Sequence, residues 1–158
     1  MLKRFMAYYK PHLKMFTLDM LASLAISIIG MIYPIITRKM LNDYIPNHKI
    51  EMVIYLGITL FALYFVRMLL RYFVQYYGHV MGVRMQADMR KDLFDKLQKL
   101  PYSYYDSHET GTILSTMTND LFDVSELAHH GPENILVASF TIIGSLIYLM
   151  FINWILGV

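Results

Sequence analysis

The chain has 158 residues, no cysteine and a formal net charge of +2. Hydrophobic residues make up 56% of it and charged residues 16%, whereas a soluble domain carries about 25% charged residues. This composition excludes a disordered chain and a disulfide-stapled scaffold. Because acidic residues nearly balance basic ones, it also excludes the strongly basic surface of a nucleic-acid-binding protein. We therefore expect a membrane protein.

Three apolar segments are long enough to cross a bilayer, which takes roughly 20 helical residues. They lie at 15–36, 52–77 and 135–158, and the charges inside them are Asp19 in the first and Arg67 and Arg71 in the second. The expected fold class is all-α: a polytopic membrane protein with three transmembrane helices.

The basic residues predict how the chain is oriented. Residues 1–14 hold four lysines and arginines and no acid, residues 80–100 hold five, and the connection 38–51 holds three. Since basic residues collect on the cytoplasmic side, we expect a multi-pass cell-membrane protein with its N-terminus in the cytoplasm. Residues 1–14 mix aromatic and basic side chains, which favours a helix lying on the inner membrane surface; the alternative is a plain positively charged leader.

The segment 78–131 is too polar for lipid but has helical periodicity. Apolar residues at spacings of three and four form a stripe from Met85 to Leu100, and Pro101 follows it. The second helix should therefore run over 52–100, roughly 73 Å, with roughly 35–40 Å in the cytoplasm. A return leg at 112–131 has a matching length, so the two legs should pair as a long antiparallel hairpin. The expected apolar face of the return leg consists of Ile113, Leu114, Met117, Leu121, Val124 and Leu127. At Gly131-Pro132 we expect a kink on re-entry, with the end of the leg as the alternative.

The connection 101–111 between the legs is rich in tyrosine and lies far from any core. Exposed aromatic side chains at such a tip favour a partner surface, and the alternative is a turn packed onto its own legs. The expected organisation is a cytoplasmic surface (elbow) helix at 1–14, transmembrane helix 1 at 15–37, an extracellular loop at 38–51, transmembrane helix 2 with its cytoplasmic extension at 52–100, an intracellular loop at 101–111, a cytoplasmic leg with transmembrane helix 3 at 112–153, and the start of a further segment at 154–158.

An ordered set of residues crosses the hairpin: an arginine-led helix ending in Leu-Pro, two aromatic residues, Thr-Gly, and then Ser and Asn-Asp on the return leg. This set resembles the transmembrane domain of ATP-binding-cassette (ABC) exporters of the six-helix half-transporter type. Thr116 departs from the family pattern, which has an arginine there. The matching residues are Arg90, Leu93, Phe94, Lys96, Leu97, Leu100, Pro101, Tyr104, Tyr105, Asp106, Thr110, Gly111, Ile113, Leu114, Ser115, Thr118, Asn119 and Asp120.

The resemblance implies a coupling helix that docks on a nucleotide-binding domain, formed by Tyr104, Tyr105, Asp106, Ser107, His108, Glu109 and Thr110. It further implies a second half-transporter, as a homodimer or heterodimer, and ATP and Mg²⁺ in the full-length protein. This chain has no phosphate-binding loop and no cassette signature, so we expect no catalytic residue and no cofactor within it. We expect it to be a fragment or half of a split protein.

Ionisable residues inside spans are candidates for the translocation path. Asp19 and Arg71 lie at similar predicted depths and are expected to pair, or to reach the interface, whereas Arg67 lies one turn deeper and is expected to face the path. His129 and His130 point ~100° apart on a helix, so they do not form a shared chelate. Even with Glu126 nearby, we expect a polar cluster and no metal site.

Two alternatives stay open to the exporter. A membrane sensor would continue its helical stalks into an output domain and would not return to the membrane. A non-ATP channel or structural module would act from this chain alone, without a cassette partner. Lipid, peptide and amphipathic drug all suit the aromatic, methionine-rich path as substrates.

Overall fold

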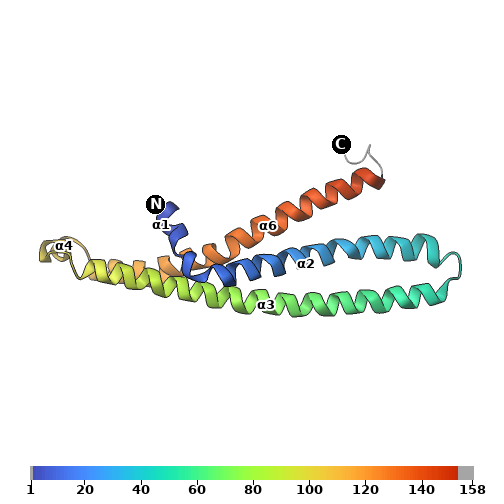
Figure 1. Ribbon diagram of the computed structural model, residues 1–158. Helices are drawn as coiled ribbons and strands as arrows, with labels where there is room; N and C mark the ends of the chain where they lie inside the picture. The colour runs from blue at the N-terminus through green and yellow to red at the C-terminus, as the bar shows by residue number, and fades with distance from the viewer. Residues whose placement is uncertain (1, 153–158) are drawn as a thin grey trace. The chain divides into compact units, whose positions relative to one another are not determined.

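The computed structural model describes residues 2–152, and they form helices joined by short connections (Figure 1). The elements are α1 (Leu2–Ala7), η1 (Lys10–His12), α2 (Leu13–Lys39), η2 (Met40–Tyr44), α3 (Ile50–Leu97), α4 (Tyr102–Ser107), α5 (Thr110–Ser115), η3 (Thr116–Asp120) and α6 (Leu121–Ile152). Strands are absent from residues 2–152, and three helical stretches, Arg4–Tyr44, Ile50–Leu97 and Thr110–Ile152, are long and apolar enough to span a membrane. The all-α fold class with three transmembrane helices is confirmed.

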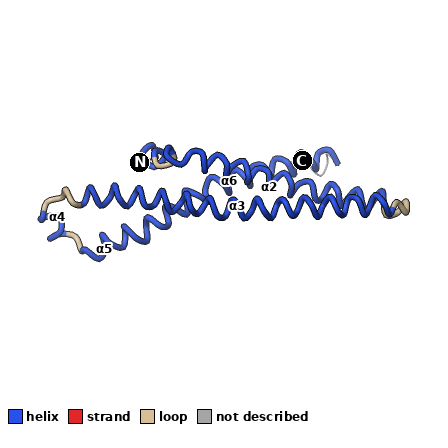
Figure 2. Tube along the Cα trace, turned by 60° about the horizontal axis from the view of Figure 1, so that its bottom comes forward, coloured by secondary structure: helices blue, strands red, loops and turns tan. Residues whose placement is uncertain are grey.

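The chain divides into two compact units, unit 1 (Met1–Leu18 and Tyr76–Pro132) and unit 2 (Asp19–Gln75 and Glu133–Val158). The expected segment 154–158 lies outside the described residues. Figure 2 shows that helix makes up nearly all of the trace, with short loops on both sides of α4.

Unit 1 contains the predicted hairpin. Its outgoing leg is the part of α3 from residue 76 to Leu97, and its return leg runs from α5 through η3 into α6 up to Pro132. Gly78 lies against His129, Gly82 lies beside the carbonyl of Ser125, and Arg90 Nε donates a hydrogen bond to the Met117 carbonyl at 3.1 Å. A step forward along one leg is matched by an equal step back along the other, so the legs are antiparallel and keep one register.

Methionines form the centre of unit 1. Met81, Met85 and Met89 project from the outgoing leg at helical spacing and are buried against Tyr9 and Ala128. The predicted stripe is confirmed at Met85 and Met89 and extends one turn further back to Met81. Burial of such flexible side chains against a small residue lets the legs approach closely.

The N-terminal segment packs on this core. The expected single helix over 1–14 is wrong in detail: α1 is followed by a turn and by the short η1, where Pro11 lacks a backbone donor. Tyr9 Oη donates to the Ala128 carbonyl at 2.7 Å, and Tyr8 Oη donates to the Asp92 carboxylate at 2.7 Å. A buried or half-buried hydroxyl needs an acceptor, and here the acceptors lie on α6 and α3. The two bonds therefore attach the N-terminal segment to both legs.

The outgoing leg ends at Leu97, three residues before the expected Leu100. The amides of Lys99 and Leu100 bond to carbonyls three residues back, so the chain tightens before Pro101. A residue that precedes proline is disfavoured in the α region, which explains the early end.

The apolar face of the return leg is confirmed in part: Leu121 and Val124 pack on the core of unit 1, but two leucines of that face do not. Leu114 and Leu127 are exposed, whereas Ser125, Ala128 and His129 are buried. Small residues replace leucine at this contact because Gly78 and Gly82 bring the backbones of the two legs close together. The helix α6 continues through Pro132 to Ile152, so the alternative in which the return leg ends at Gly131-Pro132 is wrong.

Unit 2 holds the apolar parts of α2, α3 and α6. Ala22 and Ile26 of α2 are buried against Val74 of α3, and Tyr33 meets Tyr64 edge to face. The expected loop 38–51 is shorter, because η2 extends the helix to Tyr44 and α3 begins at Ile50.

Candidate functional site

The tip of the hairpin is built by α4 between Pro101 and His108, which are both extended. Proline fixes its own φ and lacks the N–H that a helix interior uses, and the new helix begins directly after it, at Tyr102. It ends at Ser107, whereas the implied coupling helix spans 104–110. Glu109 and Thr110 instead start the return leg, as the residue before α5 and the first residue within it.

Several tip residues hold the tip together. Tyr105 Oη donates to the carbonyl of Leu97, the last residue of α3, at 2.7 Å. The His108 ring stacks on Tyr104 with centroids 4.1 Å apart, and Ser107 Oγ lies 3.0 Å from the Tyr104 carbonyl. Part of the expected coupling helix thus packs onto the hairpin itself, which agrees with the alternative of a turn packed onto its own legs.

The rest of the tip faces outward. Tyr102 is 90% exposed, and Asp106 and Glu109 are exposed as well. Beside them, a groove of about 340 Å³ is lined by Leu93, Leu97, Tyr104, Ser107, His108, Glu109, Thr112, Ile113 and Thr116. An aromatic ring and two carboxylates beside a groove can bind another protein.

Arg90 links the legs next to a local change in helix type. Residues Thr116–Asp120 form a π turn, and Thr118 Oγ1 bonds back to the Leu114 carbonyl at 3.0 Å. The wider turn loosens the normal carbonyl ladder, and Arg90 donates to the Met117 carbonyl inside it. The arginine at the head of the sequence pattern is therefore a cross-leg contact.

Unit 2 contains a cavity of about 510 Å³ between α2, α3 and α6. Its lining includes Arg67 and Arg71 beside apolar residues such as Ile26, Met31 and Leu149. Asp19 is buried but is not part of this lining. The cavity therefore brings together the two arginines, and the pairing of Asp19 with Arg71 stays a prediction.

Arg67 is held over the backbone of α2. A Cβ built on Gly30 would lie 3.3 Å from Arg67 Nη2, and the guanidinium lies over the Tyr64 ring, 5.4 Å from its centroid. Arg67 Nε is buried and makes no hydrogen bond within residues 2–152. A cation that lines a largely apolar cavity in this way can bind an anionic group.

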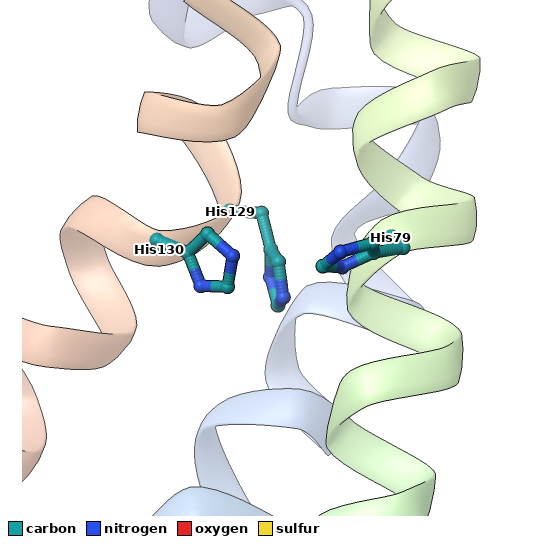
Figure 3. Close-up of side chains that lie close together, drawn as sticks. All are labelled: His79, His129 and His130. Atoms are coloured by element: carbon teal, nitrogen blue, oxygen red, sulfur yellow. The ribbon is translucent and has the colours of Figure 1, made fainter. Parts of the chain in front are cut away.

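Three histidines of unit 1 lie close together between the two legs, as Figure 3 shows. His79 comes from α3, and His129 and His130 come from α6, with the His129 ring between the other two. The ring centroids are 4.4 to 5.5 Å apart, and one nitrogen from each ring lies within 4.8 Å of the others. Sequence reasoning considered the adjacent pair and missed His79; aligning two legs of equal length antiparallel would have placed it opposite.

Burial and neighbouring charged groups set the environment of this cluster. His129 is 2% exposed and precedes the uncharged apolar run of α6 by several residues. Burial, followed by the neighbouring His130 and His79, lowers the pKa of His129 to about 4. Glu126 Oε2 lies 3.5 Å from His130 Nε2. The buried imidazole is therefore neutral at physiological pH.

Comparison with known proteins agrees with the hairpin and the three spans. Residues 16–158 match the family described as "ABC transporter transmembrane region". The chain is 41% identical over 154 residues to the "Uncharacterized ABC transporter ATP-binding protein YwjA" of Bacillus subtilis, covering 98% of this chain and 27% of that protein.

Two further relatives extend the comparison. The chain is 30% identical over 130 residues to the "Putative ABC transporter ATP-binding protein exp8" of Streptococcus pneumoniae, covering 80% of this chain and 21% of that protein. It is 24% identical over 151 residues to the "ATP-dependent lipid A-core flippase" of Thiobacillus denitrificans, covering 96% of this chain and 26% of that protein. The chain thus spans about a quarter of the length of these relatives. It is a membrane protein and belongs to the ABC transporter transmembrane-region family.

Proposed function

We propose that this chain forms part of the membrane domain of an ATP-driven exporter in the cell membrane, with its N-terminus in the cytoplasm. In this proposal the tip carried by α4 docks on a nucleotide-binding domain, which binds ATP and Mg²⁺ outside this chain. A second half-transporter completes the translocation path. The observation that carries the proposal is the antiparallel hairpin, which holds the outward-facing residues of α4 at the end of two legs in fixed register.

The course of the chain favours this function over the alternatives. A membrane sensor would continue α3 toward an output domain, whereas here the chain turns at α4 and returns through α5, η3 and α6. A channel or structural module would give no reason to expose Tyr102 beside a groove at the tip. The relatives named as ATP-binding proteins fit a membrane segment that works with such a domain.

For the translocation path, we propose Arg67 and Arg71 as residues that contact the cargo. Both line the cavity of unit 2, whose other walls are largely apolar. Such a site favours an amphipathic anion, because the guanidinium groups bind the charged end while the walls accept the apolar part. One set of relatives carries the name "ATP-dependent lipid A-core flippase", and a lipid cargo would fit this site. Asp19, which is buried, remains a candidate residue of the translocation path in this proposal.

Site-directed crosslinking in the full-length protein tests the docking proposal. A photo-reactive amino acid at Tyr102 or Asp106, the outward-facing positions of α4, should capture a peptide of the nucleotide-binding domain, identified by mass spectrometry. The matched control is Val83, which is 63% exposed but lies on the leg and should not capture that peptide. Equal capture from Val83, or none from α4 in a protein that hydrolyses ATP, would contradict docking at the tip.

A further inference from the structure

The three histidines at the closest approach of the legs have the geometry of a metal centre before the ion binds. In a tetrahedral zinc site each nitrogen lies 2.0–2.1 Å from the ion, so two ligand nitrogens are about 3.4 Å apart. Here one nitrogen from each of His79, His129 and His130 lies within 4.8 Å of the others. Small side-chain rotations within normal torsional wells can close the remaining distance. We propose that these three histidines bind one divalent transition-metal ion of the zinc class, which joins α3 to α6.

The backbone leaves a specific space for the central ligand. A Cβ built on Gly78 would collide with the His129 ring, so a side chain at this position is incompatible with the imidazole where it lies. Glycine in the middle of a helix costs roughly 0.5–1 kcal/mol relative to alanine. The absence of a side chain at Gly78 therefore leaves the space in which the His129 ring lies between His79 and His130.

The donor set selects the kind of ion. Three imidazoles without a thiolate suit Zn²⁺, Co²⁺, Ni²⁺ or Cu²⁺, whereas Mg²⁺ and Ca²⁺ prefer oxygen ligands. Glu126, whose carboxylate lies 3.5 Å from His130 Nε2, adds a negative charge beside the cation. It can supply the fourth ligand or orient His130 from outside the first shell of ligands. The proposed metal site is structural: it links the two legs.

The site also explains how adjacent histidines can both contribute. On one helix His129 and His130 point in different directions, but His79 arrives from the opposite leg and faces both rings, with centroid distances of 5.4 and 5.5 Å. An ion can contact all three rings only when the two legs are paired in this register. Metal binding should therefore stabilise the paired legs against separation.

Metal titration of the full-length protein, purified without a polyhistidine tag, tests the proposal. Zn²⁺ affinity is measured by competition with a chromophoric chelator, and Co²⁺ binding by its visible absorption. We expect one site per chain, with affinity reduced at least about tenfold in His79→Ala and in His129→Ala. His48→Asn is the control: it removes an imidazole from the α2–α3 connection and suits the positive φ of 52° there, so it should bind as the wild type does.

A glycine pair separates the metal site from a general loss of folding. Gly78→Ala leaves all three histidines in place but displaces the His129 ring, so zinc affinity should fall at least about tenfold. Gly82→Ala, one turn along the same helix, places its Cβ 3.4 Å from the Ser125 carbonyl, an ordinary contact. It should keep zinc affinity within about twofold. Both changes raise helix propensity.

Hydrogen exchange locates the ion. At a zinc concentration 100 times its Kd, amide exchange in 76–82 and 125–132 should slow by about 100-fold, since the ion binds only the paired legs. Absence of binding by the wild-type protein, equal affinity of Gly78→Ala and Gly82→Ala, or protection elsewhere in the chain would each overturn the proposal. The histidines would then be a polar cluster, and because this test needs neither ATP nor cargo, the proposed exporter function would be unaffected.

Discussion

Met85 offers the sharpest test of how the hairpin is held together. Its side chain is 0% exposed and lies in the core between Met81, Met89 and Tyr9. Met85→Ala removes the thioether and leaves a cavity. Such substitutions cost 2–5 kcal/mol, depending on how far the surroundings collapse into the space. Because two of the neighbours are methionines, which repack readily, we expect the lower part of this range, about 2–3 kcal/mol.

Amide hydrogen exchange in the full-length protein measures this loss where it occurs. When opening limits exchange as an equilibrium, about 2–3 kcal/mol corresponds to roughly 30- to 150-fold faster exchange of the protected amides of unit 1. Met85→Leu keeps most of the volume and should cost less than about 1.5 kcal/mol. Val83→Ala, on the exposed side of the same leg, should change exchange by less than about twofold.

The reasoning has a clear point of failure. If Met85→Ala and Val83→Ala accelerate exchange equally, the methionine stripe does not hold the legs together. If Met85→Ala accelerates exchange in α2 as much as in unit 1, the residue acts through a global change of the protein, and the assignment of this core to the hairpin is wrong.

Three further changes test other contacts. Tyr9→Phe should lower the stability of unit 1 by about 1 kcal/mol, measured by hydrogen exchange, because the variant lacks the buried hydroxyl that donates to a carbonyl of α6. Burial raises the Tyr9 pKa above 10, so the wild type should also lose stability above pH 10 more steeply than the variant. Gly30→Leu should push Arg67 out of its place and reduce cargo-stimulated ATP hydrolysis about fivefold, equivalent to about 1 kcal/mol, while Gly57→Leu, where added atoms meet open space, should not. Tyr105→Phe should increase proteolysis at the tip about threefold, for a lost bond of roughly 0.5–1 kcal/mol, and an unchanged cleavage rate would refute its role as a tether.

The length and course of the helices could be predicted because their signals are local. Charge-free runs define the spans, and apolar spacing defines the outgoing leg from Met85 onward. The end of α3 was misplaced because the last turn tightens before Pro101, an effect of backbone sterics that hydrophobic periodicity does not record. Similarly, Pro132 breaks the rule for helix interiors and yet lies within α6.

The contacts between elements were harder to predict, because they depend on register. Leu127 was expected to face the opposite leg, but close approach at two glycines brings Ser125 and His129 into the contact. Arg90 donates to a backbone carbonyl within a π turn, a contact that charge patterning does not indicate. Neither a close helix contact nor a π turn has a strong signal in a single sequence.

The fixed register of the hairpin also bears on how force could pass between α4 and the membrane. The residues that shape the tip, such as Tyr105, bond to the end of α3, and the position of that end depends on the contacts at Met85, Arg90 and His129 further along the legs. A tip on unpaired helices would lose direction through bending of each helix. Paired legs transmit a push as one body, because every cross-leg contact resists sliding of one leg past the other. If α4 docks as proposed, residues far from α4 should therefore affect coupling as much as those that touch the docking partner.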